Sequence, residues 1–336
     1  MAITIKDIAR ESGYAVGTVS RVLNNHPDVS ETARAKIMEV VDKYHFKLNN
    51  NAKHLKQQAS NGIAIIVKGS QNMLFASIVE QMQGMLTEKG FACIIYYINE
   101  MENEVETAVR ICTERRPVGI MFLGYHLPFF RQRFQAINVP CVLVTNSADS
   151  MDYPNLSSVS IDDTLAARAA VEHLLEMNHR EIGILGGHID KSSMAYARYL
   201  GCKEAFESHG LQFDSEKQYI ESLFGMADGY SAMQQLLEKM PKLTAVFAMS
   251  DVMAVGAMRA ITDAGLCVPN DISVVGFDGL ELGEYLSPKL TTIKQDREKI
   301  AQRSVEILLA NIDNPQKAVY ETVPFSVIVG ESTKQL

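Results

Sequence analysis

From residue 62 onward, short apolar runs alternate with stretches of helical periodicity, and this alternation restricts the fold more than any other feature. The runs include GIAIIV at 62–67, VGIMFL at 118–123, EIGILGG at 181–187 and DISVVGF at 271–277. Continuous β-branched runs separated by amphipathic helices predict parallel sheets that helices cover on both faces. The pattern occurs in two successive sets, 62–161 and 162–290. We therefore expect an α/β fold with two similar lobes, a cleft between them, and a chain that crosses between the lobes after residue 290.

Residues 1–46 instead predict three short helices. Thr4 and Asp7 form an approximate capping pair for the first helix, and Gly13 fits the residue that ends it. Ser30 can cap the third helix. An apolar stripe follows in that helix, formed by Ile37, Val40, Val41 and Tyr44. Two short helices joined by a tight glycine turn and braced by a third predict a helix-turn-helix unit.

The second of these helices contains a glycine, Gly17, which costs about 1 kcal/mol relative to Ala inside a helix. Val19, Val22 and Leu23 are spaced three and four residues apart and define one buried face. Gly17, Thr18 and Arg21 share the opposite face. Such a face combines small side chains with one guanidinium, and we interpret it as a surface that lies closely against a shaped polar partner.

Charge is unevenly distributed along the 336 residues. The chain as a whole carries a net charge of −8, yet residues 1–60 contain nine Lys and Arg against six Asp and Glu. This basic segment could face a polyanion while the acidic remainder stays clear of it. No apolar run reaches the roughly 18 residues of a membrane span, and MAITIKDIAR has charges where a signal peptide needs its apolar stretch. We expect a cytoplasmic protein.

Catalysis and metal binding find no support in the sequence. The motifs GxSxG, HExxH and the P-loop do not occur, and GILGG at 183–187 lacks the spacing of a dinucleotide site. The eight His residues show no metal-ligand spacing, and the five cysteines form no CxxC pair. We expect no cofactor, no metal and no enzyme, and we interpret the cysteines as small core residues.

Several blocks together resemble the lactose-repressor/galactose-repressor (LacI/GalR) family of bacterial transcription regulators. They are TIKDIARESGYAVGTVSRVLNN, NNNAKHLK, TAVFAMSDVMAVGAMRAITDAGL, VPNDISVVGFDG and LTTIKQD. The resemblance covers nearly the whole chain in the expected order. It implies a homodimer with a small all-α helix-turn-helix domain at 1–46, a hinge helix at 47–61, and an effector-binding and dimerisation domain at 62–336. That last domain would be two-lobed, with doubly wound parallel sheets, as in periplasmic sugar-binding proteins.

The resemblance also implies roles for the second helix. Val16 and Gly17 match the positions that choose the operator, and Arg21 can donate two hydrogen bonds to a guanine edge. Thr18 and Ser20 suit phosphate oxygens. Further positions that match DNA-contacting residues are Thr4, Asn24, Asn49 and Ala52. The alternative is a merely solvated helix face.

The hinge is expected to form a helix only on DNA, because isolated helices below roughly 12–15 residues are marginal in water. In a dimer, the resemblance places Leu55 as a wedge in a minor-groove base step and Lys53 near the groove floor. A flexible tether with an incidental Leu is the alternative. The chain departs from the family pattern at Ala15, Leu48, Lys53 and Gly330, where Ser, Pro, Arg and Arg respectively are usual.

In the cleft, sugar hydroxyls need bidentate polar partners and an aromatic ring against the apolar face of the sugar. Arg198, Asp278 and Phe224 match ligand-contacting positions of the family. Phe75, Ser250 and Gln295 match less closely. Each has a plainer alternative, because Asp278 and Gly279 also signal a turn, Phe224 could be core, and Arg198 could be a solvated helix residue.

We predict a dimeric repressor of carbohydrate utilisation genes, acting on operator DNA at the nucleoid and released by a mono- or disaccharide. A regulator that needs its ligand as corepressor is the nearest alternative. A sugar-binding transport component would share the two lobes but needs export. An α/β enzyme would need a catalytic constellation.

Overall fold

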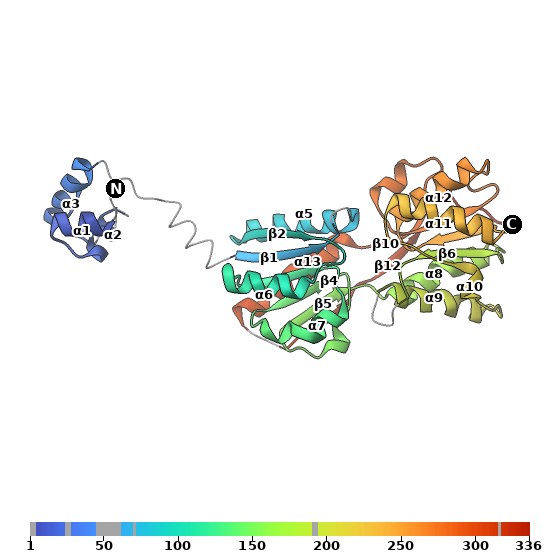
Figure 1. Ribbon diagram of the computed structural model, residues 1–336, viewed down its shortest axis with the longest axis horizontal. Coiled ribbons are helices and arrows are strands. Elements are labelled where there is room, and N and C mark those ends of the chain that lie inside the picture. Colours follow the sequence, from blue (N-terminus) through green and yellow to red (C-terminus); the bar gives the residue numbers. More distant parts are fainter. Residues whose placement is uncertain (1–4, 24–27, 45–61, 70–71, 190–193, 315–316) are drawn as a thin grey trace. The chain divides into compact units, whose positions relative to one another are not determined.

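The computed structural model contains two separate compact units, one within residues 1–59 and one within 60–336 (Figure 1). The first is helical and the second contains two six-stranded sheets. No helix in the described ranges combines the length and the apolar character needed to cross a bilayer. The residues that the structure describes are 5–23, 28–44, 62–69, 72–189, 194–314 and 317–336.

The described residues of the first unit, 5–23 and 28–44, form three helices, α1 (Ile5–Ser12), α2 (Val16–Leu23) and α3 (Glu31–Lys43). Gly13 ends α1 with φ +74°, and its N–H donates to the Ala9 carbonyl over 3.1 Å. Ser30 caps α3, because its Oγ accepts a hydrogen bond of 3.3 Å from the Ala33 N–H. Both predicted helix boundaries are confirmed.

The core of this unit lies where α1, α2 and α3 meet. Val19 and Val22 of α2 are buried there together with Ile37 of α3. Gly17 and Arg21, on the other face of α2, are exposed. The predicted division of α2 into a packed and an outward face is therefore confirmed.

The first lobe of residues 60–336 is built on a parallel sheet with the strand order β11-β5-β4-β3-β1-β2. Its strands are β1 (Gly62–Lys68), β2 (Ala92–Ile98), β3 (Gly119–Leu123), β4 (Cys141–Val144), β5 (Leu156–Ser160) and β11 (Tyr320–Thr322). Its helices are α5 (Met73–Glu88), α6 (Glu104–Glu114), α7 (Leu127–Arg133) and α13 (Arg297–Asp313). Ile63 and Ile65 of β1 pack with α5 and α13, whereas Ala64 and Ile66 pack with α6 and α7. Helices thus cover both faces of the sheet, as the alternation predicts.

The second lobe repeats this arrangement with the strand order β12-β10-β9-β8-β6-β7. Its strands are β6 (Ile182–Gly186), β7 (Tyr219–Glu221), β8 (Ala245–Ala248), β9 (Ser273–Asp278), β10 (Thr291–Gln295) and β12 (Phe325–Ile328). Its helices are α8 (Asp163–Glu176), α9 (Met194–Ser208), α10 (Ser215–Gln218), α11 (Met226–Lys239) and α12 (Asp251–Asp263). Phe247 of β8 packs with α8 and α9, whereas Val246 and Ala248 pack with α11 and α12. The expected α/β architecture with two doubly wound lobes is confirmed.

One strand departs from the expected parallel pairing. β12 runs antiparallel to β10. β10 runs out of the second lobe towards α13 in the first lobe. Only residues 323 and 324 separate β11 in the first lobe from β12 in the second. β12 therefore enters the second sheet directly from the other lobe and pairs in the reverse direction.

The chain crosses between the lobes three times. It leaves the first lobe between β5 and α8, returns between β10 and α13, and crosses again between β11 and β12. Figure 1 shows β10 and β12 close to these connections. Three short segments therefore join the two lobes.

Two buried strands escape prediction because their sequences are polar. β5 reads LSSVS and β10 reads TTIKQ, so neither has a continuous apolar run. The buried hydroxyls of β5 are satisfied by distant backbone: Ser158 Oγ accepts from the Ala148 N–H and Ser157 Oγ from the Val319 N–H, each at 3.0 Å. Long-range partners of this kind leave no periodic signal in the sequence.

Gly330, which stands where the family often has Arg, lies against neighbouring backbone. A Cβ at this position would lie 2.5 Å from the Lys289 carbonyl oxygen. Its N–H donates to Thr291 Oγ1 over 3.0 Å. This backbone path therefore has no room for any side chain at residue 330.

The cysteines only partly meet expectation. Cys141 and Cys202 are buried, and Cys93 and Cys112 are partly buried. Cys267, just after α12, is exposed, so the expectation that all five lie in the core is wrong at this position. Its place in the turn between α12 and β9 explains the exposure, because such connections run over the surface.

Glycines set the close packing of α11 against α12. A Cβ on Gly256 would lie 2.0 Å from the Met226 carbonyl oxygen, and one on Gly229 would lie 2.4 Å from that of Met253. The obstructing atoms are backbone and cannot rotate away. Gly84 in α5 is different, because a Cβ there would meet no described heavy atom within 4 Å.

We predict that Gly256→Ala lowers the free energy of unfolding by about 1–3 kcal/mol, the usual cost of overpacking. Helix propensity alone would give the opposite sign, since Ala is favoured over Gly by about 1 kcal/mol. Gly84→Ala is the matched control and should raise the free energy of unfolding by up to about that amount. Urea unfolding of the three proteins measures both effects, and stabilisation by Gly256→Ala would contradict the close approach of α11 and α12.

Candidate binding cleft and nucleic-acid interface

A cleft of about 570 Å³ is lined by residues from both lobes of the second unit. Lys68 ends β1 and Thr145 follows β4, whereas Ser250 follows β8 and Gln295 ends β10. The lining thus comes from the carboxyl ends of strands in both sheets. Open parallel sheets place their ligands at this edge.

All six residues predicted to contact a ligand line this one cleft. They are Phe75, Arg198, Phe224, Ser250, Asp278 and Gln295. The first comes from α5 in the first lobe, and the other five come from the second lobe or, for Gln295, from the strand that leads out of it. The fold therefore gathers side chains that are distant in sequence.

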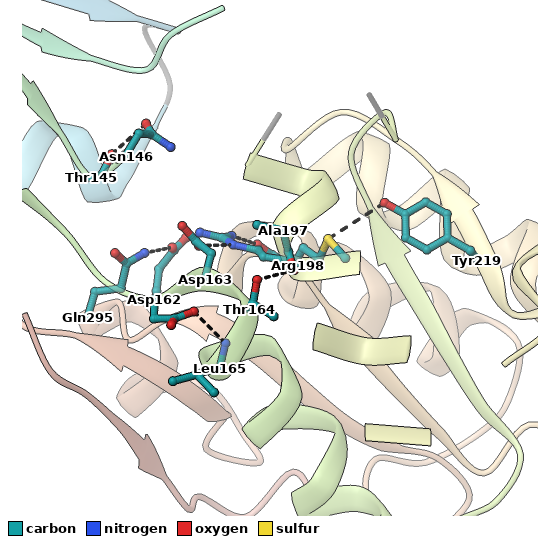
Figure 2. Close-up of polar contacts among 12 residues, drawn as sticks. Thr145, Asn146, Asp162, Asp163, Thr164, Leu165, Ala197, Arg198, Tyr219 and Gln295 are labelled. Carbon is teal, nitrogen blue, oxygen red and sulfur yellow. Dashed lines mark hydrogen bonds and ion pairs between the residues drawn. The ribbon is translucent and has the colours of Figure 1, made fainter. Parts of the chain in front are cut away.

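Arg198 on α9 is buried and held by three contacts, of which Figure 2 draws the polar ones. Its Nε donates to Asp163 Oδ1 over 2.8 Å, and its Nη1 donates to the Met249 carbonyl over 2.6 Å. Its guanidinium carbon lies 3.6 Å from the centroid of the Phe277 ring. Arg198 is thus no solvated helix residue. Among the described residues these bonds occupy Nε and Nη1, which leaves the Nη2 donors for a molecule in the cleft.

Asp278 and Gln295 form a second polar group in the cleft. Gln295 Nε2 donates to Asp278 Oδ1 over 2.9 Å. Gln295 is almost fully buried, and its Oε1 has no hydrogen-bond partner in the described part of the chain. An unsatisfied buried amide oxygen is rare in native proteins and requires an explanation. A ligand hydroxyl that donates to it would satisfy it.

The backbone at Asp278 has φ +120°, which is rare outside glycine. Gly279 follows with φ +69°, so a turn does occur here, and it carries Asp278 into the cleft. The turn is anchored by Asp251, whose Oδ2 accepts from the Leu280 N–H over 2.6 Å and whose Oδ1 accepts from Thr292 Oγ1 over 2.5 Å. Strained backbone held by such bonds is typical of functional sites.

Burial dominates the electrostatics of the acids near the cleft. It raises the pKa of Asp278 to about 8, although the positive charge of Arg198 opposes the shift. Burial likewise raises the pKa of Asp251 to about 7, against the hydrogen bonds from Thr292 and Leu280. The pKa of Asp163 is also raised by burial, and here too Arg198 opposes the shift. Desolvation disfavours the charged form of each carboxyl.

Two aromatic rings of the cleft rest against glycines. The Phe75 ring lies 3.3 Å from where a Cβ of Gly124 would be, and the Phe224 ring lies 2.7 Å from that of Gly187. Phe224 also packs against both apolar clusters of its lobe, so it contributes to the core and to the cleft. The glycines leave room for the two rings.

Ser250 has a structural role that is set by the protein itself. Its Oγ accepts a hydrogen bond of 3.1 Å from the Met253 N–H and so caps α12. The hydroxyl proton can still be donated to a ligand.

Sequence reasoning missed an ion pair in the wall of the cleft. Lys68 lines the cleft, and its Nζ donates to Glu104 Oε2 over 2.6 Å. Glu104 is fully buried and its Oε1 also accepts from the His126 N–H over 2.5 Å. Glu104 and Asp163 both look like ordinary acids in the first turn of a helix. For Asp163, a signal was present in the sequence. The neighbouring Asp162 already caps α8, so a second Asp at this place is not needed for capping.

No group of three or more His, Cys, Asp or Glu side chains in the described ranges is arranged to hold a metal ion.

The candidate nucleic-acid residues of α2 lie on one outward face. Val16 is 42% exposed, and Gly17 and Arg21 are exposed as well. Thr18 and Ser20 are half-buried beside them. The other predicted DNA-contacting residues lie outside the described residues; they are Thr4, Asn24, Asn49, Ala52, Lys53 and Leu55.

The fold and the cleft define a ligand-binding protein with a separate helix-turn-helix unit. Two family models match the chain: "Bacterial regulatory proteins, lacI family" over residues 4–49 and "Periplasmic binding protein-like domain" over 171–333. The chain is 36% identical to the HTH-type transcriptional regulator MalR of Clostridium butyricum, over 92% of this chain and 93% of that one. The chain belongs to the lacI family of bacterial regulatory proteins.

Two solved structures extend the likeness. One is the lac repressor dimer bound to operator and the anti-inducer ONPF, with a TM-score of 0.74 and 26% identity over 99% of this chain and 100% of that one. The other is the complex of the transcriptional regulator CelR with cellobiose, with a TM-score of 0.71 and 26% identity over 98% and 100%. The resemblance noted in the sequence is confirmed at the level of the family.

We predict that Asp278→Asn reduces the pH dependence of stability. The raised pKa means that folded Asp278 keeps its proton between about pH 4 and pH 8, whereas the unfolded chain releases it. The free energy of unfolding should therefore fall as pH rises through this window, with Asp278 contributing at most about 1.4 kcal/mol per pH unit. Urea unfolding at pH 5.5 and 7.5 should show a smaller fall in Asp278→Asn than in the natural protein. Asp313→Asn, at an exposed position of α13, should leave the fall unchanged, and equal falls in all three proteins would contradict the assignment.

Proposed function

We propose that this protein is a sequence-specific transcription repressor that binds operator DNA as a homodimer and is released when a sugar occupies the cleft. The polar floor of the cleft carries this proposal, because Arg198, Asp278 and Gln295 are buried there and Gln295 Oε1 still lacks a donor. A molecule rich in hydroxyls can donate to that oxygen and also bond the guanidinium and the carboxyl. The relative solved with cellobiose and the operator-bound dimer support the two halves of the proposal.

The two aromatic rings also fit a sugar. Phe75 enters the cleft from the first lobe and Phe224 from the second. A pyranose has an apolar face of C–H groups and a rim of hydroxyls, so it needs flat apolar surface as well as polar groups. Ligand sites generally combine an apolar, aromatic lining with a few well-placed polar side chains.

Two of the proposed ligand-binding residues, Arg198 and Gln295, are linked to the segments that cross between the lobes. Arg198 pairs with Asp163, which directly follows the first crossing, and Gln295 directly precedes the second. A sugar that contacts both side chains acts on two of the three connections at once. It can favour one lobe arrangement only through its differential affinity for that arrangement, typically about 1–3 kcal/mol of coupling.

The outward face of α2 fits the major groove. Arg21 can donate two hydrogen bonds to a guanine, and Val16 can contact a thymine methyl. Neither packing within the chain nor backbone conformation requires a glycine at position 17. A Cβ there would meet no described heavy atom within 4 Å, and the φ of Gly17 is not left-handed. The close approach of a partner outside the chain gives it a reason.

The remaining parts of the proposal rest on the family. Residues 47–61 act as a hinge that forms a helix on the operator, with Leu55 in the minor groove. The protein works in the bacterial cytoplasm, where the chromosome is. A regulator that needs the sugar as corepressor is the second candidate, and the direction of the sugar effect on DNA binding separates the two.

We predict that Gly17→Ala stabilises the N-terminal unit but weakens operator binding. Alanine favours the helix by up to about 1 kcal/mol. The added methyl lies on the face that approaches DNA, and we expect a loss of about tenfold or more in affinity, comparable to one lost base contact. Thermal unfolding by circular dichroism and fluorescence anisotropy on an operator selected from random duplexes measure the two effects.

Met38→Ala, at an exposed position of α3, is the control and should leave operator affinity unchanged. Unchanged affinity in Gly17→Ala as well would remove this residue from the interface. Failure of the selection to recover any two-fold-symmetric site would overturn the DNA-binding half of the proposal.

We predict that Gln295→Met produces a repressor that the sugar no longer releases. Methionine has similar length but makes no comparable hydrogen bonds, so sugar affinity should fall about tenfold, the equivalent of one or two buried hydrogen bonds. Operator affinity without sugar should be retained. Isothermal titration with the inducer and a gel shift on the same protein separate the two effects.

Gln235→Met, at an exposed position of α11, is the matched control and should respond like the natural protein. A normal response in Gln295→Met would place the sugar elsewhere. Tighter operator binding of the natural protein on adding sugar would favour corepression.

A further inference from the structure

The mouth of the cleft carries apolar side chains that are exposed to solvent. Met73 from the first lobe is 43% exposed, and Leu223 and Met226 from the second are 60% and 44% exposed. All three line the cleft. Single exposed apolar residues are ordinary, but apolar side chains that border a polar binding site from both lobes mark a surface for a ligand.

The cleft is also larger than one hexose requires. A hexose displaces about six water molecules, or roughly 180 Å³ at about 30 Å³ each. The cleft measures about 570 Å³. Arg198 and Gln295 converge on one polar centre, as Figure 2 shows, so a single ring bonded there would leave most of the remaining volume beside the apolar mouth.

The charges around the cleft disfavour an anion. Among the described lining residues Lys68 and Arg198 are the cations, and each is already paired with a carboxylate outside the lining, the buried Glu104 at 2.6 Å and the mostly buried Asp163 at 2.8 Å. An acidic ligand would have to compete with these carboxylates at short range.

The lining itself adds further acids. Glu100 and Asp228 border the cleft together with Asp278. Even with Asp278 protonated, four carboxylates outnumber the two cations Lys68 and Arg198. The four are Glu100, Glu104, Asp163 and Asp228. Asp228 is half-buried and Glu100 is exposed, so an anion in the cleft is repelled more strongly by Asp228 than by the better solvated Glu100.

We infer that the cleft takes an uncharged glycoside larger than one hexose, with one ring on the polar centre of Arg198, Asp278 and Gln295 and the remainder against Met73, Leu223 and Met226. This inference rests on the proposed sugar response and specifies it. It separates di- and oligosaccharides from free hexoses, and neutral sugars from uronates and sugar phosphates.

The test is isothermal titration of the full chain with matched probes. Maltose, cellobiose, lactose, sucrose and trehalose are compared with glucose and galactose, and with glucuronate and glucose 6-phosphate. At least one neutral disaccharide should bind about tenfold or more tightly than the free hexoses, through the extra apolar area that it buries, while the two anions show no binding.

The outcomes separate this inference from the function on which it rests. A hexose that binds as tightly as the best disaccharide overturns the size requirement. Tighter binding of glucuronate or glucose 6-phosphate overturns the charge argument, yet leaves a sugar-responsive repressor in place. Binding of no sugar at all overturns both.

A pair of leucine variants tests where the second ring lies. Leu223→Ala should weaken binding of the best disaccharide about fivefold, since it removes apolar contact area, and should leave binding of the corresponding hexose unchanged. Leu165→Ala is the matched control, because Leu165 is a similarly exposed leucine (51%) of the same lobe that does not line the cleft. Equal disaccharide affinities of the two variants would overturn the placement.

Discussion

Both sheets of the second unit are parallel over most of their width, and parallel strands can be joined only by crossover connections. The crossover helices must cover the faces of the sheets, and the carboxyl ends of neighbouring strands must then lie along the same edge. The cleft follows from this constraint. Lys68, Thr145, Ser250 and Gln295 are all found at strand ends, although the segments between them are long.

The cleft has buried polar groups, and burying such groups costs free energy. Arg198 and Asp278 are buried and Asp163 is mostly buried, and a buried charge destabilises a protein unless it is paired and hydrogen-bonded. Each bond that compensates Arg198 also fixes its direction, since the guanidinium is held by a carboxylate, a carbonyl and a ring. The site is therefore preformed, and a ligand need not order it.

The two units differ in which groups they bury and which they expose. The helical unit buries Val19 and Val22 in its own core and leaves a glycine and an arginine facing outward. The two-lobed unit buries polar groups that a ligand would reach through the cleft. Coupling between such units needs an element with two arrangements. Two of the three lobe crossings adjoin cleft residues, since Asp163 after the first pairs with Arg198 and Gln295 precedes the second.

The local part of this structure could be predicted from the sequence. Periodicity placed the helices of the first unit, the two sets of strands and helices, and the outward face of α2, because helical and strand patterns depend on neighbours within a few residues. The six cleft residues came from a family resemblance, and the fold gathers them along one cleft.

Only the tertiary structure decided the rest. β5 and β10 are buried despite their polar sequences, since their hydroxyls bond to distant backbone and to Asp251. β12 is antiparallel because the chain reaches it from the other lobe. Glu104 and Asp163 become partners of Lys68 and Arg198 because α6 packs against β1 and α8 packs against α9. Local sequence carries no record of that packing, because it records only what neighbouring residues require of one another.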